Sequence, residues 1–344
     1  TPRFDYSGGA TCPSLLLEPS RDNRIVQSEY FGGWTANTTI TANAALSPEG
    51  VQNAYNIASN SGVGNGILLI SGVLSSTQYV CSIYVKSAGA TTGKLRLFDG
   101  SSGASTTTTF TPTSEWQRVE VTRTTGAGTF QVRTDIHSND GDLLIYGAQL
   151  EAGSYSTSYI PTYGVNQTRA VDVCNKTGVT ALIGQSEGTM FLDFVVNDSN
   201  IFQIIYQART TGGTNVGQID FRIQSGNLRV LGNDGGTAQF NISAGAAVAG
   251  TRYKCALRYA TNDVAFYVNG VLKGSDTNAS FSSSTLSQIT FNENGSNFYP
   301  NVDVKQALLF KTPLSNLDLA ILTGATTYNT FAEMALALNY TVYE

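Results

Sequence analysis

The clearest pattern in the chain is an alternation of polar and apolar residues. Residues 78–86 read Gln-Tyr-Val-Cys-Ser-Ile-Tyr-Val-Lys, and similar alternation recurs at 94–98 and 116–121. A period of two is typical of a β-strand with one buried face, and the Gly, Ser, Thr and Asp residues between these segments are typical of turns. A longer apolar run at 142–151 indicates a strand buried on both faces. The pattern predicts a β-sandwich over residues 24–151.

A second set of strand patterns follows an irregular segment at residues 152–172, where Gly and Pro interrupt a run of Tyr and Thr. This segment is predicted to be a linker between two domains. Further on, Asn269 and Gly270 lie between two apolar runs, and Asn-Gly favours a two-residue hairpin turn because both of its residues tolerate positive φ. Residues 173–344 are therefore predicted to form a second β-sandwich. Its predicted strands lie at 188–196, 202–206, 218–223, 227–231, 253–259, 263–272 and 303–310.

The two ends of the chain depart from the strand pattern. Residues 1–23 contain a Gly-Gly turn and a short Leu-rich stretch that stops at Pro19, and we interpret them as an N-terminal connector. Near the other end, Ser315 and Asp318 have the spacing of a helix cap, and apolar residues recur at helical spacing within 331–338. The predicted fold class is all-β, with two tandem β-sandwich (jelly-roll) domains and short C-terminal helices.

Composition supports this fold and excludes some partners. The chain has 344 residues, of which 35 are Gly, and charged residues make up only 13% of it. The net charge is -5 and the basic residues are scattered singly, so we expect no nucleic-acid partner. No apolar stretch reaches the roughly 18 residues that a membrane span needs, so we expect no membrane insertion. Because the chain begins with Thr1, we expect a fragment or a processed product.

The cysteines and the single histidine offer little metal or redox chemistry. Cys12, Cys81, Cys174 and Cys255 form no Cys-x-x-Cys pair, and one histidine leaves a zinc site almost without ligands. Cys81 and Cys255 lie within predicted strands, where we expect buried thiols. A pairing of Cys12 with Cys174 stays open.

Several short motifs stand out beside the strand pattern. They are residues 3–6, 15–21, 82–86, 116–118, 146–153 and 157–162. Together they resemble the carbohydrate-binding-module-like sandwich of tailed-phage fibre and spike proteins. The segment at 168–173 is similar to the junction after which such proteins carry a concanavalin A-like (laminin G-like) sandwich, and residues 265–270 resemble a hairpin of that module.

The resemblance covers nearly the whole chain and implies a component of the virion surface. It implies a homotrimer, contacts with other virion proteins, and host surface polysaccharide as the partner. Three functions stay open: a non-catalytic phage fibre or adhesin component that binds a host cell-surface glycan, a structural decoration or assembly protein that binds no glycan, and the binding appendage of a polysaccharide depolymerase.

Aromatic residues are the candidates for glycan binding, because a ring packs well against the C–H face of a sugar. The candidate residues are Trp34, Trp116, Tyr155, Tyr159 and Tyr163. For the two tryptophans, core or edge packing is the stronger interpretation. The three tyrosines cluster in the predicted linker, where packing between modules or against a neighbouring subunit is the stronger alternative to a ligand cleft.

Three aspartates are candidates for a metal site. Asp135, Asp140 and Asp142 supply hard oxygen ligands of the kind that Ca²⁺ prefers, and a structural calcium is the one candidate cofactor. The EF-hand spacing is absent. Related sandwiches often hold calcium through an acidic residue in the last strand, where this chain has residues 146–149, Tyr-Gly-Ala-Gln, and this departure weakens the expectation of an inherited site. His137 lies in the same segment and is interpreted as a solvated loop residue.

No catalytic arrangement is recognisable in the sequence. Glycosidases with a concanavalin A-like fold use two carboxylates, commonly within Glu-x-Asp-x-x-Glu, and this pattern is absent. The acidic residues of the second set of strands stand singly, at Asp193, Asp220, Asp263 and Asp303. No Gly-x-Ser-x-Gly motif accompanies His137. We therefore predict that the chain is not an enzyme.

Overall fold

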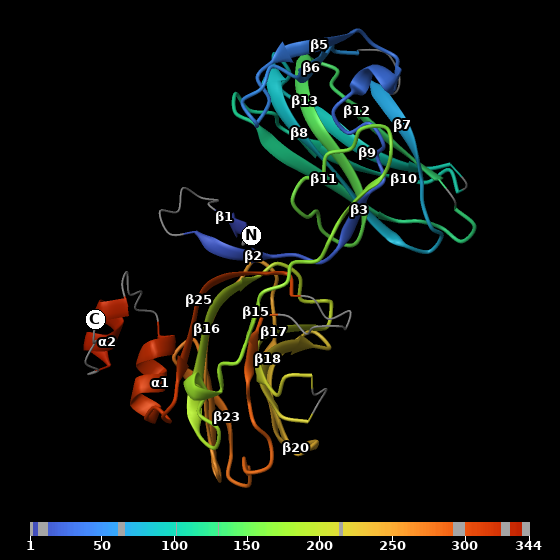
Figure 1. Cartoon of the computed structure of the whole chain (residues 1–344). Coiled ribbons are helices and arrows are strands. Elements are labelled where there is room, and N and C mark those ends of the chain that lie inside the picture. The colour runs from blue at the N-terminus through green and yellow to red at the C-terminus, as the bar shows by residue number, and fades with distance from the viewer. Residues whose placement is uncertain are drawn as a thin grey trace. The chain divides into compact units, whose positions relative to one another are not determined.

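The computed structural model is all-β, as predicted, and divides into two compact units (Figure 1). It describes residues 3–5, 13–60, 66–100, 102–129, 131–212, 216–291, 300–324 and 331–338. One unit, which we call the first sandwich, is Ser20–Ala170. The other, the second sandwich, combines Thr1–Pro19 with Val171–Glu344.

Within the described residues, the first sandwich has two five-stranded antiparallel sheets. Its strands are β3 (Arg21–Asn23), β4 (Thr35–Ala36), β5 (Ile40–Ala45), β6 (Ala54–Ile57), β7 (Ile67–Gly72), β8 (Gln78–Ala88), β9 (Gly93–Asp99), β10 (Ser105–Phe110), β11 (Gln117–Thr124), β12 (Gln131–His137), β13 (Asp142–Ala152) and β14 (Gln167–Arg169), and a 3-10 turn, η2, covers Phe31–Gly33. The sheet with the order β11-β8-β13-β6-β5 is called the β13 sheet, and the sheet with the order β10-β9-β12-β7-β4 is called the β12 sheet. The strands β14 and β3 form a separate ribbon.

The predicted alternation explains how these strands pack. In β9 every second side chain is buried, and Leu95 and Leu97 join Ile83 and Val85 of β8 in the core of the first sandwich. Burial of apolar surface stabilises a fold by roughly 25 cal/mol per Å². The packing of this core is therefore the main favourable contribution to the folding free energy of the first sandwich. The core thus fixes which side chains of each strand point outward.

The second sandwich is built from a seven-stranded and a six-stranded sheet in the described part of the chain. Its elements are β1 (Arg3–Asp5), β2 (Ser14–Leu17), β15 (Asn175–Thr177), η3 (Thr180–Leu182), β16 (Gly188–Val196), β17 (Gln203–Arg209), β18 (Gln218–Gln224), β19 (Asn227–Asp234), β20 (Thr237–Ala246), β21 (Arg252–Ala260), β22 (Asp263–Val268), β23 (Val271–Asp276), β24 (Gln288–Thr290), β25 (Val302–Phe310), α1 (Asn316–Thr323) and α2 (Phe331–Ala337). The sheet orders are β1-β2-β25-β16-β21-β22-β23 and β15-β24-β17-β18-β19-β20.

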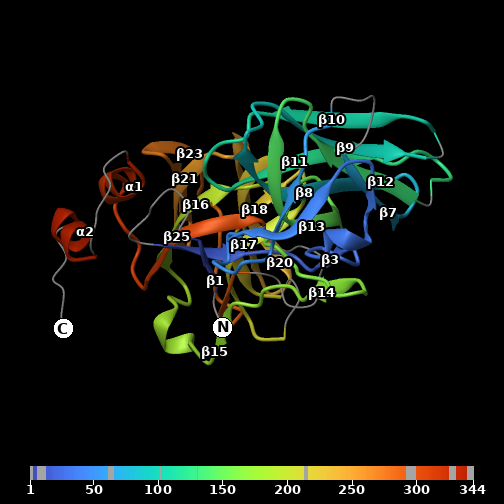
Figure 2. The ribbon, with the colours of Figure 1, turned by 90° about the horizontal axis from the view of Figure 1, so that it is seen from above.

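Two local predictions in the second sandwich are confirmed. Asn269 and Gly270 both have positive φ, at 50° and 81°, and connect β22 to β23 as a hairpin. Ser315 and Asp318 form a reciprocal capping box at the start of α1. This helix packs against the seven-stranded sheet (Figures 1 and 2). Its residue Leu319 joins an apolar cluster with residues of the sheet.

The predicted connector over residues 1–23 differs from the structure. The strand β2 pairs with β25, and Leu17 is 2% exposed within the core of the second sandwich. The ribbon strand β3 belongs instead to the first sandwich. A four-residue apolar stretch carries no signal for a partner strand at the other end of the chain, so its pattern alone suggested a connector.

The predicted linker at residues 152–172 is also more ordered than expected. Thr157, Ile160 and Thr162 are buried, and β14 pairs with β3. Most of this segment therefore packs as part of the first sandwich.

Two further sequence expectations concern membrane insertion and the thiols. In the described ranges, no helix is long and apolar enough to cross a membrane. Cys81 and Cys255 are buried, as predicted, and they and Cys174 are free thiols. Cys12 lies outside the described residues.

Candidate functional site

The outward face of the β13 sheet carries a row of large side chains. Ile83 of β8 and Ile145 of β13 are buried in the core. Because side chains alternate between the faces of a strand, the residues that follow them, Tyr84 and Tyr146, point outward, and they are direct cross-strand partners. Arg118 of β11 is the partner of Tyr84 on its other side, with its guanidinium 5.5 Å from the centre of the tyrosine ring. Adjacent strands thus place a cation and two phenols side by side.

The chain after β13 adds a third tyrosine to this face. The ring of Tyr159 lies edge-on to Tyr146 and Tyr84, with centroids 5.8 and 6.3 Å apart. Gly147 permits this approach, since its φ is +61° and a Cβ here would lie 3.2 Å from both Tyr159 and Tyr84. Glycine alone avoids the backbone and steric costs at this position. We call Tyr84, Tyr146 and Tyr159 the tyrosine cluster.

Glu29 accepts hydrogen bonds beside the tyrosine cluster. The hydroxyl of Tyr159 donates to Ser28 Oγ over 2.7 Å and lies 3.3 Å from Glu29 Oε1. The hydroxyl of Tyr163 lies 3.3 Å from the same carboxylate oxygen. Tyr163 is 71% exposed. A carboxylate and an open aromatic face therefore lie next to each other.

Burial and two carboxylates keep these phenols protonated. Burial raises the pKa of Tyr146, and the nearby carboxylates of Glu49 and Glu29 raise it further. Burial is also the largest cause of the raised pKa of Tyr159, to which Glu29 adds. Both phenols therefore stay protonated at neutral pH, and the hydroxyl of Tyr159 donates to Ser28.

A loop closes over the same face. Trp116 directly precedes β11 and Leu46 directly follows β5, and these two strands are the edges of the β13 sheet. Neighbouring strands lie about 4.8 Å apart, so roughly four such spacings separate the edges. Nevertheless, Trp116 Nε1 donates a hydrogen bond to the carbonyl oxygen of Leu46 over 3.0 Å. The chain segments at the two edges therefore meet over the face, and residues 46–53 bring Glu49 near enough to Tyr146 to raise the pKa of its phenol.

Trp34 is a core residue and offers no ring face to a ligand. It is 4% exposed, and its ring centre lies 5.1 Å from that of Phe31. Its Nε1 donates to the carbonyl oxygen of Gln27 over 3.1 Å. This agrees with packing, which was the stronger interpretation of Trp34 from the sequence.

The other four aromatic candidates are placed differently from one another. Trp116 is half-buried at the edge of the β13 sheet, Tyr159 belongs to the tyrosine cluster, and Tyr163 lies beside Glu29. Tyr155 is half-buried under the guanidinium of Arg21, which lies 5.2 Å from its ring centre. The structure thus gathers Trp116, Tyr159 and Tyr163 around one surface.

Sequence reasoning missed five residues of this surface. They are Glu29, Glu49, Tyr84, Arg118 and Tyr146. Tyr84 was detectable, because it alternates with apolar residues in a predicted strand and must therefore point outward, whereas Tyr146 lies in the continuous apolar run at 142–151, which does not distinguish the two faces. The two glutamates lie in irregular segments, where no periodicity marks them.

The three aspartates of the predicted calcium site bind protein groups. Asp135 pairs with Arg96 over 2.5 Å. Asp140 accepts hydrogen bonds from the hydroxyl and main-chain N–H of Thr91, and hydrogen bonds lower its pKa, with Thr91 the largest cause. Asp142 accepts two protein hydrogen bonds. Among the described residues, no group of three or more His, Cys, Asp or Glu side chains could hold a metal ion, so a calcium site receives no geometric support.

His137 is the last residue of β12 rather than a loop residue. Its side chain is 12% exposed, and its Nδ1 lies 3.3 Å from Asp135 Oδ1. The interpretation as a solvated loop histidine is wrong, because the strand continues into the Asp-rich segment.

Arginines pair with single carboxylates in the strands of the second sandwich. The pairs are Asp193–Arg252, Asp220–Arg222 and Asp263–Arg258. In the first two, both carboxylate oxygens accept from one guanidinium at 2.6 to 2.7 Å. This fork geometry favours a structural role over the paired carboxylates of a glycosidase.

Comparisons with known proteins give only distant likenesses. No protein-family model and no curated protein sequence matches the chain. Among solved structures, a carbohydrate-binding module (CBM40) of the Ruminococcus gnavus IT-sialidase, bound to α2,3-sialyllactose, is 16% identical over 42% of this chain and 86% of that chain, with a TM-score of 0.37. The galectin LEC-6 of Caenorhabditis elegans is 16% identical over 40% of this chain and 89% of its own, with a TM-score of 0.28.

A leech intramolecular trans-sialidase is also similar, at 16% identity and a TM-score of 0.36, over 42% of this chain. The match spans only 24% of that enzyme's chain. At these TM-scores the likenesses assign no ligand and no site residue to this chain.

Proposed function

We propose that the chain is a non-catalytic glycan-binding protein and that the outward face of the β13 sheet is its binding surface. The observation that carries this proposal is the convergence of the exposed ring of Tyr163 with the carboxylate of Glu29 beside the tyrosine cluster. An exposed ring packs against the C–H face of a sugar, and an adjacent carboxylate accepts hydrogen bonds from sugar hydroxyls. Half-buried Trp116 and the carboxylate of Glu49 extend the same surface.

The charge of this surface indicates which glycans it binds. Glu29 and Glu49 both lie near the hydroxyl of Tyr146, and the whole chain carries a net charge of -5. A second negative charge placed against two carboxylates is repelled. The surface is therefore suited to a neutral, hydroxyl-rich part of a glycan.

The biological setting of the proposal is a phage fibre on the virion surface. Its support is the set of sequence motifs that resemble tailed-phage fibre and spike proteins. In this setting the chain is a homotrimer, contacts other virion proteins and binds host surface polysaccharide. Three linked copies would raise a weak single-site affinity through high effective concentration.

The test is a screen of the intact chain against neutral bacterial polysaccharides, followed by calorimetry with Glu49→Gln and a matched control, Glu187→Gln. Glu187 is exposed in the second sandwich. We expect Glu49→Gln to weaken binding by about tenfold and Glu187→Gln to leave it unchanged. Absence of binding, or equal affinities of the two variants, would overturn the proposal.

A second candidate is virion decoration without glycan binding. The high exposure of Tyr163 also suits a subunit contact. In that case Tyr163→Ala would dissociate the oligomer in a mass measurement, and the intact chain would bind no polysaccharide. A role as the appendage of a depolymerase requires that the longer parent protein digest the bound polysaccharide.

The proposal requires no cofactor. We expect removal of Ca²⁺ with a chelator to leave both the melting temperature and the glycan affinity unchanged. A fall in the melting temperature that Ca²⁺ reverses, but that Asp140→Asn abolishes, would instead assign a structural calcium to the segment of Asp135, Asp140 and Asp142.

A further inference from the structure

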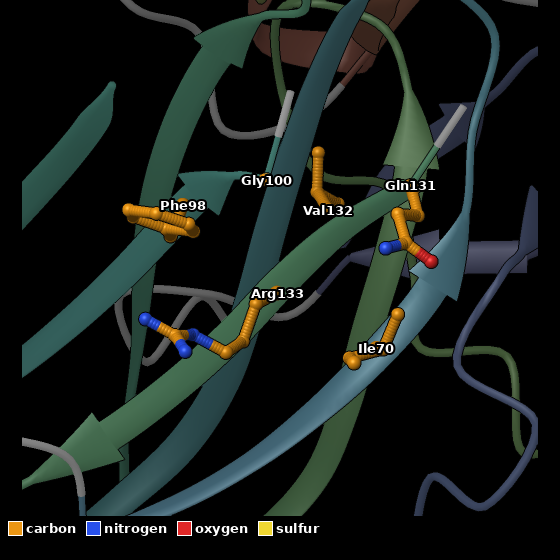
Figure 3. Close-up of a pocket in the computed structure, with 6 residues that line it drawn as sticks. All are labelled: Ile70, Phe98, Gly100, Gln131, Val132 and Arg133. Carbon is orange, nitrogen blue, oxygen red and sulfur yellow. The ribbon is translucent and has the colours of Figure 1, made fainter. Parts of the chain in front are cut away.

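The β12 sheet carries a pocket on its outward face, on the opposite sheet from the tyrosine cluster. The pocket has a volume of about 170 Å³. Its lining residues are Ile70, Phe98, Gly100, Gln131, Val132 and Arg133 (Figure 3). Arg133 of β12 is the direct cross-strand partner of both Ile70 of β7 and Phe98 of β9. Three neighbouring strands therefore build the pocket.

Arg133 stacks on an aromatic ring and has no counter-ion among the described residues. Its guanidinium lies 4.5 Å from the centre of the Phe98 ring, and Figure 3 shows it directed toward that ring. The Nε of Arg133 is buried and has no hydrogen-bond partner in the described part of the chain. No carboxylate of the described residues pairs with this guanidinium, so within this part of the chain its charge has no partner.

Arg96, the neighbouring arginine on the same face, differs from Arg133 because it has a carboxylate partner. Arg96 of β9 donates from Nε to Asp135 over 2.6 Å, and its Nη2 lies 2.5 Å from the same carboxylate oxygen. Asp99, which follows Phe98, accepts instead from the hydroxyl of Thr129 and from main-chain N–H groups. The sheet thus supplies a carboxylate to Arg96 and none to Arg133.

These features fit the carboxylate of an acidic sugar. A guanidinium presents parallel N–H donors that match the two oxygens of a planar carboxylate, and its stacking on Phe98 holds the fork in place. Ile70 is exposed on the other side of β12 and offers apolar surface to a sugar ring, and Gln131 adds an amide donor and acceptor. Pockets for larger ligands usually exceed 300 Å³, so this one is suited to a single sugar residue.

We propose that the Arg133 pocket is a second, separate binding site, which takes an acidic sugar residue such as a uronic acid. This site lies on a different sheet from the tyrosine cluster and binds the class of sugar that Glu29 and Glu49 repel. A polysaccharide with alternating neutral and acidic residues would thus find complementary surfaces on both sheets of the first sandwich.

The test is a titration of the intact chain with glucuronic acid, followed by ligand-detected NMR, with glucose and inorganic sulfate as comparison ligands. We expect glucuronic acid to bind at least about tenfold more tightly than either. Equal binding of glucose would show that the carboxylate is not recognised. Equal binding of sulfate would show non-specific attraction of anions, and either result would overturn the proposal.

Substitutions then test whether glucuronic acid binds at Arg133. Arg133→Gln is expected to abolish binding of glucuronic acid, and Arg133→Lys, which keeps the charge and loses the fork, to weaken it by about tenfold. Lys94→Gln removes a positive charge from the same sheet, four residues from Phe98 along β9, and should have no effect. Equal losses in Arg133→Gln and Lys94→Gln would overturn the proposal, because net charge would then explain them. If Arg133→Gln does not fold, the affinity of Arg133→Lys for glucuronic acid alone tests the site.

The two proposed sites can be tested independently of each other. Glu49→Gln should leave binding of glucuronic acid unchanged, and Arg133→Lys should leave binding of a neutral glycan unchanged. A loss of glucuronic acid binding in Glu49→Gln would place the acidic sugar at the tyrosine cluster and overturn the Arg133 site.

Discussion

The indole N–H of Trp116 donates to the carbonyl oxygen of Leu46 over 3.0 Å, although the two residues adjoin strands at opposite edges of the β13 sheet. This bond ties residues 46–53 over the outward face and holds Glu49 near Tyr146. The position of one glutamate in the proposed glycan site therefore depends on a tryptophan that need not touch the ligand.

Replacing Trp116 by Phe should release this loop while keeping an aromatic ring. Loss of one hydrogen bond costs about 1 kcal/mol of unfolding free energy. Within the loop, Ser47 and Gly50 donate main-chain hydrogen bonds to Val51 and Ser47. Their amides should exchange with solvent faster in Trp116→Phe than in the parent, beyond any change in amides of β13. Equal exchange in the two proteins would show that the Leu46 contact does not hold the loop.

Substitution of Gly147 tests the packing of the tyrosine cluster, and Gly128 provides a matched control. Both residues have positive φ, at +61° and +80°, but a Cβ at Gly147 meets Tyr159 and Tyr84, whereas a Cβ at Gly128 meets nothing within 4 Å. Gly128→Ala should cost about 1 kcal/mol from backbone strain alone. Gly147→Ala should cost roughly 1–3 kcal/mol more, because the rings must move.

The measurement for both glycine variants is urea unfolding followed by tryptophan fluorescence. The chain has 2 Trp residues, Trp34 and Trp116, and both lie in the first sandwich, so this signal reports that unit alone. Equal costs of the two substitutions would contradict the observed contact between Gly147 and the tyrosine rings.

Alkaline pH should destabilise the first sandwich partly through Cys81. Burial raises the pKa of this thiol from 9.0 to about 12, so the unfolded chain loses the proton at lower pH than the folded chain. The stabilisation is complete below about pH 9 and falls as pH rises toward 12, with a slope of about 1.4 kcal/mol per pH unit for one proton. In Cys81→Ala, the fall in unfolding free energy between about pH 9 and 11 should be shallower by roughly this slope, measured by tryptophan fluorescence. An unchanged slope would show that Cys81 does not stay protonated in the folded state.

Local sequence signals predicted the elements of the fold well and their distant contacts poorly. The alternation in β8 and β9, the Asn269-Gly270 turn and the cap of α1 each depend on a few adjacent residues, and each is present in the structure. The outward direction of Tyr84 was implicit in the alternation of β8, but the apolar run at 142–151 did not indicate the direction of Tyr146.

The contacts that build both proposed sites depend on strand register instead. The neighbours of Arg133 are Ile70 and Phe98 because β7, β12 and β9 pair in one register, and a shift by one residue would turn Arg133 toward the core. Glu29 and Glu49 lie in irregular segments, where Tyr163 contacts Glu29 and Trp116 bonds to Leu46 at the start of the segment of Glu49. No periodic pattern encodes such paths, so the sequence alone could not assemble either site.

The local sequence pattern and the structure disagree about β2, and this disagreement can be tested directly. Leu17 of β2 is 2% exposed in the core of the second sandwich, and its strand pairs with β25. Leu17→Ala should therefore cost about 2–5 kcal/mol, which lowers the melting temperature of a domain of this size by several degrees. In calorimetry the transition of the second sandwich should shift, while the tryptophan-detected transition of the first sandwich should not.

Leu317→Ala is the matched control, because Leu317 lies on α1 of the same unit and is 69% exposed, so its cost should stay within about 0.5 kcal/mol. If both variants melt like the parent, residues 14–17 contribute no packing, and the connector that the local pattern indicated would be the better description of this segment.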